Sequence, residues 1–266
     1  MGVCNQRYPT DLTDSQWHLI KDWLPPPART GRPRLDLREV INAVCYVLKG
    51  GIQWRMMPTD FPKWQSVYSH FRRWRTGGIW RRVHDALRAQ ARCKAGRHKH
   101  PTAGCLDSQS VKTTAEAAPG TRGSDANKRV TGRKRHVLTD TTGLLLVAAV
   151  TPANVQDKAG ALVAFRRLGG GGKKLRRVWA DGAYRTTRGH LASWVERRGI
   201  SLTAVERPEG QRGFQVLPRR WVVERTFAWL SQSRRLGKDY ERLAETSEAL
   251  VYIAMTRLML RRLAPK

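Results

Sequence analysis

The stretch GRKRHVLTDTTGLLLVAAVT, residues 132–151, indicates the fold class of this chain. Two segments, 132–140 and 143–151, have the composition of β-strands and flank the turn Asp140-Thr141-Thr142-Gly143. Strand-like segments separated by a short polar turn with glycine predict a β-hairpin, in which Asp140 serves the turn. We therefore expect a sheet in the second half of the chain.

Further strands and helices alternate after this hairpin. We expect Asn154 to cap the next helix, Asp157 to lie in its first turn and Pro218 to lie in the first turn of a later helix. A strand that ends at Asp107 precedes the hairpin. Together these elements predict an α/β domain with a mixed central sheet. The elements after the hairpin are a helix at 155–168, a strand at 175–181, a helix at 185–198, a strand at 199–205, a helix at 218–236 and a last helix at 243–263.

The first 93 residues have a different pattern, in which apolar residues recur at helical spacing. Thr13 is the expected N-cap of the first helix. Several short helices joined by tight turns are typical of a helix-turn-helix module that binds DNA. A plain helical bundle with a solvated basic face would show the same sequence pattern. The expected domains are 1–93, a basic linker at 94–102, and 103–266. The further helices expected in the first domain are 37–49, 63–75 and 79–93.

The net charge of the chain is +29, because 50 Lys and Arg residues outweigh 21 Asp and Glu residues. A field of this sign favours a polyanionic partner, of which a phosphate backbone is the commonest. No apolar run approaches the length of a membrane span. We therefore expect a nucleic-acid partner and no membrane.

Three carboxylates stand among apolar residues, which is unusual for surface charges. Asp107 follows Ala-Gly-Cys-Leu, Asp181 follows Val-Trp-Ala, and Glu224 lies between Trp-Val-Val and Phe-Ala-Trp. A buried carboxylate costs several kcal/mol unless a partner compensates it. A divalent metal would compensate all three, and so would arginines, which this chain has in excess.

We expect these carboxylates to converge at the carboxyl ends of neighbouring strands, where open α/β sheets place their ligands. Asp107 and Asp181 each end a predicted strand, and Glu224 on its helix could face the same edge. Oxygen ligands favour two Mg²⁺ ions, with Mn²⁺ as a substitute. Two such ions promote in-line displacement at a phosphodiester.

Basic residues surround these carboxylates and also line the helix at 63–75. For Arg220 we weigh phosphate binding equally against an ion pair with Glu224, four positions later. For His136 we prefer a phosphate contact to a proton shuttle. The predicted DNA contacts are Lys63, Arg72, Arg73, Arg75, Lys112, Arg133, Lys134, Arg135, His136, Arg220, Arg225, Arg234 and Arg235.

Six motifs in this order resemble bacterial insertion-sequence transposases of the DDE class, in insertion-sequence family five. Together they run along essentially the whole chain. Arg220 and Glu224 fit the signature Tyr-x2-Arg-x3-Glu-x6-Lys of sister families, but Leu217 replaces its Tyr and Ser231 its Lys, a role that Arg234 and Arg235 would take over. The motifs are YPTDLTDSQW, GIQWRMMP, LDSQSVK, TGRKRHVLTDTTGLLL, ADGAY and WVVERTFAWLSQSRRLGKDYE.

The resemblance implies a ribonuclease H-like catalytic domain after a helical DNA-binding region, with Asp107, Asp181 and Glu224 as catalytic residues. It implies a bacterial cytoplasmic enzyme at the nucleoid that binds terminal inverted repeats, hydrolyses a phosphodiester with Mg²⁺ and transfers the freed end to target DNA. Pairing two ends suggests a homodimer or larger assembly. Two alternatives are a nuclease that cuts without joining, and a non-catalytic sequence-specific DNA-binding protein such as a decayed transposase or repressor.

Overall fold

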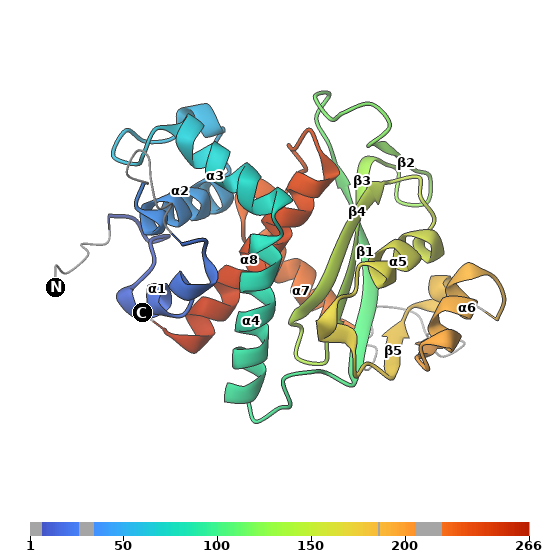
Figure 1. Cartoon of the computed structure of the whole chain (residues 1–266). Coiled ribbons are helices and arrows are strands. Elements are labelled where there is room, and N and C mark those ends of the chain that lie inside the picture. Colours follow the sequence, from blue (N-terminus) through green and yellow to red (C-terminus); the bar gives the residue numbers. More distant parts are fainter. Residues whose placement is uncertain (1–6, 27–34, 186, 206–219, 266) are drawn as a thin grey trace. The chain divides into compact units, whose positions relative to one another are not determined.

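A computed structural model describes residues 7–26, 35–185, 187–205 and 220–265 (Figure 1). They form two compact units, which we treat separately. The helical unit holds the described residues up to Arg97, with Gln232–Gly237 and those from Ala249 onward; the sheet unit holds those of His98–Ser231 and Lys238–Glu248. This division differs from the expected one, which assigned all of 103–266 to a single domain.

The helical unit contains the helices expected from the spacing of its apolar residues. The Thr13 hydroxyl accepts a hydrogen bond from the Gln16 backbone N–H, so Thr13 caps the first helix as predicted. The second helix ends at Gly51, whose positive φ of 75° favours glycine. The elements are α1 (Asp14–His18), η1 (Lys21–Trp23), α2 (Leu37–Gly50), η2 (Trp54–Met56), α3 (Trp64–Thr76), α4 (Ile79–Lys94), η5 (Arg234–Leu236) and the part of α8 (Ala244–Leu263) from Ala249 onward.

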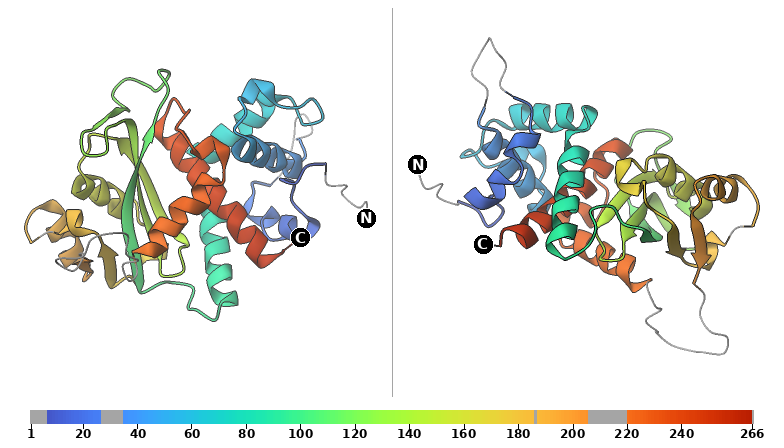
Figure 2. Two further views of the ribbon diagram at one scale, coloured as in Figure 1. Left: turned by 180° about the vertical axis from the view of Figure 1, so that it is seen from behind. Right: turned by 60° about the horizontal axis from the view of Figure 1, so that its bottom comes forward.

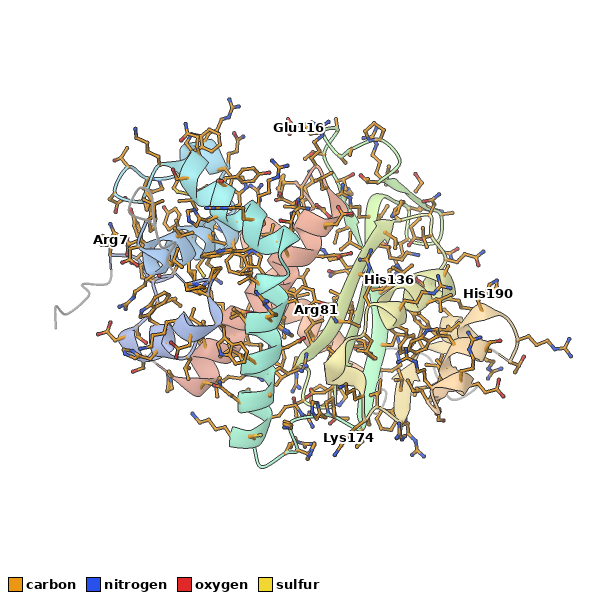
Figure 3. The ribbon with its side chains drawn as sticks, viewed as in Figure 1. Arg7, Arg81, Glu116, His136, Lys174 and His190 are labelled. Atoms are coloured by element: carbon orange, nitrogen blue, oxygen red, sulfur yellow. The ribbon has the colours of Figure 1, made fainter. Side chains whose placement is uncertain are left out.

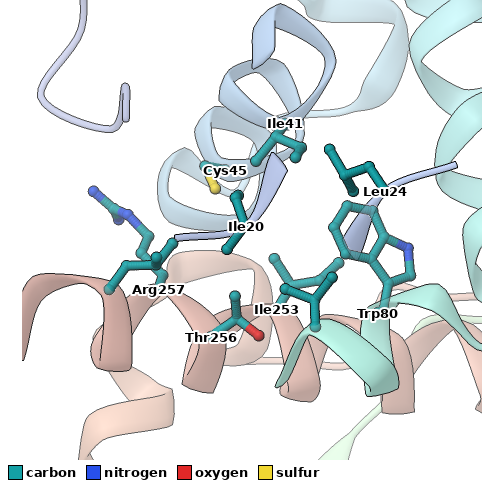
Figure 4. Close-up of a pocket in the computed structure, with 10 residues that line it drawn as sticks. Ile20, Leu24, Ile41, Cys45, Trp80, Ile253, Thr256 and Arg257 are labelled. Atoms are coloured by element: carbon teal, nitrogen blue, oxygen red, sulfur yellow. The ribbon is translucent and has the colours of Figure 1, made fainter. Parts of the chain in front are cut away.

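A dense apolar core holds these helices together. Figure 4 shows part of it, a cavity bordered by Ile20, Ile41, Trp80 and Ile253. The cavity measures about 10 Å³. One water molecule needs about that volume, so the cavity has room for one at most.

The sheet unit is built on a mixed six-stranded sheet. The strand order is β2-β3-β1-β5-β6, and β4 pairs with β3. β3 runs antiparallel to β1, β2 and β4, whereas β1, β5 and β6 are parallel. This arrangement confirms the predicted α/β class with a mixed sheet, as expected of a ribonuclease H-like domain. The strands are β1 (Ala103–Lys112), β2 (Gly123–Asp125), β3 (Val130–Asp140), β4 (Leu145–Pro152), β5 (Arg177–Ala180) and β6 (Ser201–Ala204).

The predicted hairpin is β3 and β4, joined by the predicted turn. One Asp140 carboxylate oxygen accepts hydrogen bonds from the backbone N–H groups of Thr142 and Leu144 and from the Thr142 hydroxyl. Gly143 has a φ of 85°, a conformation that glycine adopts readily. Asp140 is therefore the turn residue that the sequence predicted.

Helices cover both faces of the sheet. α5 packs on β3 and β4 and α7 packs on β1 and β3, on opposite sides of the sheet in the views of Figure 2. No helix among the described residues is long and apolar enough to cross a membrane. The helical elements of this unit are α5 (Asp157–Arg166), η3 (Gly170–Gly172), η4 (Gly182–Tyr184), α6 (His190–Arg197), α7 (Trp221–Ser231) and the start of α8.

Three predicted helix boundaries were wrong, and one of them is the start of α6, which begins at His190 and not at residue 185. α5 has Gln156 at its N-cap position, and its first turn holds Asp157 as predicted, whereas the Asn154 side chain packs against Gly123. The single helix expected at 218–236 is divided, since α7 ends at Ser231 and η5 covers Arg234–Leu236. Pro218 and Leu217 lie outside the described residues.

Candidate active site

Asp107, in β1, and Asp181, directly after the end of the parallel neighbour β5, lie level with each other. Paired residues of β1 and β5 differ by 74 positions, as in Ala103 with Arg177, and Asp107 and Asp181 differ by the same number. The backbone at Asp181 is still extended, so both carboxylates stand at one level of the sheet. The predicted approach of these two residues therefore has a basis in the strand register.

Asp107 lies within β1, since the strand continues to Lys112 and does not end at Asp107 as predicted. Burial raises the pKa of its carboxyl to about 6, although a hydrogen bond from the Ser108 N–H opposes this rise. The charge of Asp181 raises the same pKa further. Two carboxylates that repel each other in a half-buried place are typical of functional sites.

The Asp181 side chain also shapes the chain that follows it. Its Oδ1 atom accepts a hydrogen bond of 2.9 Å from the Ala183 N–H and so caps η4. Gly182, directly after it, has no side chain that would keep a phosphate away. Asp181 is thus half-buried, oriented and open to a ligand.

Glu224 lies on α7 and does not join the two aspartates directly. It forms an ion pair of 3.7 Å with Arg220, and its side chain is 49% exposed. The charge of Arg220 also lowers the pKa of Asp107, so Arg220 acts on the carboxylates of both Glu224 and Asp107. Within the described part of the chain, no three His, Cys, Asp or Glu side chains form a metal-binding group.

The donor set at Asp107 and Asp181 fits a divalent cation. Both side chains offer carboxylate oxygens, the ligands that Mg²⁺ and Mn²⁺ prefer. Burial, and further the charge of Asp181, raise the pKa of Asp107 and so disfavour its ionised form. A cation between the two carboxylates would favour that form.

Two side chains next to Glu224 attach α7 to the turn of the β3–β4 hairpin. Arg225 donates to the carbonyl of Thr142 at 2.9 Å, and Thr226 donates to the carbonyl of Gly143 at 2.9 Å. The Arg225 guanidinium also lies over the rings of Trp221 and Trp229, at 4.4 and 4.7 Å from their centroids. Arg225 therefore holds α7 in place while it stays partly exposed, and its role as a DNA contact stays a prediction.

The predicted DNA contacts on β3 are buried. Arg133 and Arg135 point to the face that α7 covers, and both are less than 2% exposed. Arg133 donates to Asp239, 3.1 Å away, and to the carbonyl of Glu241, 2.7 Å away. Because no phosphate can reach these side chains, the prediction of DNA contacts at Arg133 and Arg135 was wrong.

Lys134 and His136 point to the opposite face, towards α5. Figure 3 labels His136 there. Lys134 forms ion pairs with Asp125 at 3.3 Å and Asp157 at 3.2 Å, and it is 5% exposed. The His136 Nε2 lies 3.0 Å from the Thr151 hydroxyl, and burial lowers its pKa to about 4. Both residues support the fold, so their prediction as phosphate contacts was also wrong.

The remaining predicted contacts divide by exposure. Arg235 is buried and donates to the carbonyl of Ile52 at 2.8 Å, so its prediction was wrong as well. Arg75 and Arg220 are partly exposed. The exposed residues are Lys63, Arg72, Arg73, Lys112 and Arg234.

Lys128 is a basic neighbour of the aspartates that the sequence did not reveal. It follows β2, a strand that no pattern predicted, and its Nζ donates to the carbonyl of Ser108 at 3.3 Å. Its charge lowers the pKa of Asp107. No sequence signal separates it from the other lysines, because only the pairing of β2 with β3 brings it near Asp107.

Comparisons with known proteins place this chain among transposases. Residues 12–84 match a family described as "Putative transposase of IS4/5 family", and residues 98–259 match one described as "Transposase DDE domain". Two similar proteins come from Burkholderia cepacia. A "Putative transposase for insertion sequence element IS402" is 34% identical over 140 residues, 50% of this chain and 65% of that protein. An "Insertion element IS402 uncharacterized 16.2 kDa protein" is 32% identical over 88 residues, 30% of this chain and 60% of that protein.

The matched segments thus span less than two thirds of either relative. The match to the "Transposase DDE domain" description extends over 98–259, which is more than half of this chain, and includes both aspartates and Glu224. The chain therefore belongs to the DDE transposases of insertion sequences.

Proposed function

We propose that this chain is the transposase of a bacterial insertion sequence. It binds the terminal inverted repeats, hydrolyses a phosphodiester at the end of the element and joins the freed 3′-hydroxyl to target DNA. The placement of Asp107 level with Asp181 on parallel strands is the observation that carries this proposal. Membership of the DDE family, which implies divalent-metal use and nucleic-acid cleavage, supports it.

Asp107, Asp181 and Glu224 are the residues that would hold Mg²⁺, as two ions, with Mn²⁺ as a substitute. When bound, these ions would lower the pKa of the attacking group and stabilise the leaving oxygen. Asp107 binds in its ionised form and releases a proton where its pKa of about 6 has kept one. Arg220, which pairs with Glu224, offers a cation for the scissile phosphate.

The exposed and partly exposed basic residues hold the DNA backbone in this proposal. Their phosphate contacts position the duplex without reading its sequence, and they make binding strongly dependent on salt. Two element ends must meet for strand transfer, so the working complex is a homodimer or larger, at the bacterial nucleoid. The contacts are Lys63, Arg72, Arg73, Arg75, Lys112, Arg220 and Arg234.

The test is cleavage of a labelled duplex that carries the terminal repeat of the source element, with target plasmid present. We expect Mg²⁺-dependent cutting at the repeat end and joined products from the wild type. Asp181→Asn and Glu224→Gln should bind the duplex without cutting it, whereas Glu196→Gln, an exposed carboxylate of α6, should keep activity.

Three results would contradict the proposal. Cutting without joined products would identify a nuclease rather than a transposase. Binding with no cutting by the wild type would favour the non-catalytic DNA-binding protein. Equal cutting by Asp181→Asn would remove Asp181 from the metal site.

A further inference from the structure

α3 is the least buried of the three long helices at the start of the helical unit. Nine of the fourteen residues of α2 and seven of the sixteen of α4 are buried. In α3 only Val67, Phe71 and Trp74 are buried, out of thirteen. Most of α3 is therefore available to a partner.

The buried edge of α3 is held firmly by aromatic contacts. The rings of Trp74 and Trp80 lie 5.1 Å apart and those of Phe71 and Trp54 also lie 5.1 Å apart. The Trp80 indole N–H donates to the carbonyl of Phe71 at 3.2 Å. A helix anchored in this way presents its outer face in a defined orientation.

The outer face of α3 combines hydrogen-bonding side chains with positive charge. Gln65, Ser69, Arg72 and Arg73 are all exposed, and their spacing places them on one side of the helix. α3 contains no Asp or Glu. Gln65, Ser69 and Arg73 also line an open groove of about 950 Å³. Such a face is complementary to a polyanion that also offers hydrogen-bonding groups.

We propose that α3 reads the DNA sequence in the major groove, with Gln65 and Ser69 at the base edges and Arg72 and Arg73 on phosphates. This inference rests on the proposed function, which supplies DNA as the ligand. Recognition helices contact bases with residues of their N-terminal part, where Gln65 lies, and Ser69 is one turn further along the same side. A Gln amide pairs with both N6 and N7 of adenine, and a Ser hydroxyl can contact any base.

The experiment selects binding sites from a duplex pool with a randomised core, using the full chain. We expect the wild type to enrich a defined sequence that contains an adenine read by Gln65. In Gln65→Ala the preference for that adenine should fall about tenfold or more. The matched control is Gln90→Ala, which removes an exposed glutamine of α4 and should leave the preference unchanged.

The arginines of the same face should respond differently. Arg72→Gln and Arg73→Gln should weaken binding about equally for all duplexes and reduce the salt dependence by about one counterion each. Ser69→Ala should relax the preference at a position next to the adenine. Far-ultraviolet circular dichroism should show wild-type helix content for every variant, because all four side chains are exposed.

Three outcomes would overturn this inference. They are an unchanged preference in both Gln65→Ala and Ser69→Ala, a wild type that enriches no sequence, and tighter binding to single-stranded RNA than to duplex. Failure of the proposed function has a separate readout. A Gln65→Ala variant with altered preference would support the role of α3 even if the wild type never cut DNA.

Discussion

Arg133 provides the sharpest test of whether the basic residues of β3 stabilise the fold or bind DNA. Its guanidinium and the Asp239 carboxylate are both 0% exposed and lie 3.1 Å apart. The same guanidinium donates to the carbonyls of Thr121, Glu241 and Arg242. Arg133→Met would leave the Asp239 carboxylate buried without this partner, which costs about 3–5 kcal/mol in comparable ion pairs.

Hydrogen exchange of the β1 and β3 amides measures this loss in the sheet unit alone, whereas a melting curve would mix the two units. Arg133→Met should lower the free energy of opening by that amount. Adding Asp239→Asn should recover part of it, because the lone charge is removed. The matched control is Lys112→Met, at an exposed residue paired with Gly132 on β3, for which we expect less than about 0.5 kcal/mol.

A loss of less than about 1 kcal/mol of opening free energy in Arg133→Met would contradict the role of this ion pair in the fold. Reduced DNA affinity with unchanged amide exchange would refute it as well, since that pattern belongs to a phosphate contact.

Three further predictions concern the contacts that hold α5 and α7 on the sheet. Burial lowers the pKa of His136 from 6.5 to about 4. As the pH drops, the unfolded chain therefore binds a proton at this residue before the folded chain does. The free energy of unfolding should fall by about 3 kcal/mol between pH 6.5 and pH 4. Amide exchange against pH should show this loss, and His136→Gln should abolish it. Gly160→Ala should lower the free energy of opening by about 1–3 kcal/mol in the same measurement, because the added Cβ would lie 2.0 Å from the His136 ring. The control Gly170→Ala should be nearly neutral, because the nearest atom to its added Cβ is 4.0 Å away. Thr226→Val should lower the free energy of opening by about 1–3 kcal/mol, because it removes the hydroxyl that donates to the Gly143 carbonyl. Thr226→Ser keeps a hydroxyl and should lose much less. Equal losses for the Val and Ser variants would contradict a role for this hydrogen bond.

The candidate site was only partly predictable. Asp107 and Asp181 could be selected because each carboxylate follows an apolar strand-like segment. The sequence pattern did not show that β1 continues to Lys112, or that Lys128 lies near the pair. Both depend on the pairing of β1 and β2 with β3, which involves residues far apart in the chain.

Local patterns determined the partner class and the order of elements. The charge of +29 indicates a polyanion, and the Asp140-Thr141-Thr142-Gly143 turn indicates a hairpin, because each depends only on composition or on neighbouring residues. Tertiary structure decided which basic residues are exposed and can contact a polyanion. Arg133 and His136 belong to a strand that is covered on both faces, and alternation along a strand cannot show whether a face is covered. The level placement of Asp107 and Asp181 likewise arose from the β1–β5 register, which is set by packing and hydrogen bonding between distant segments.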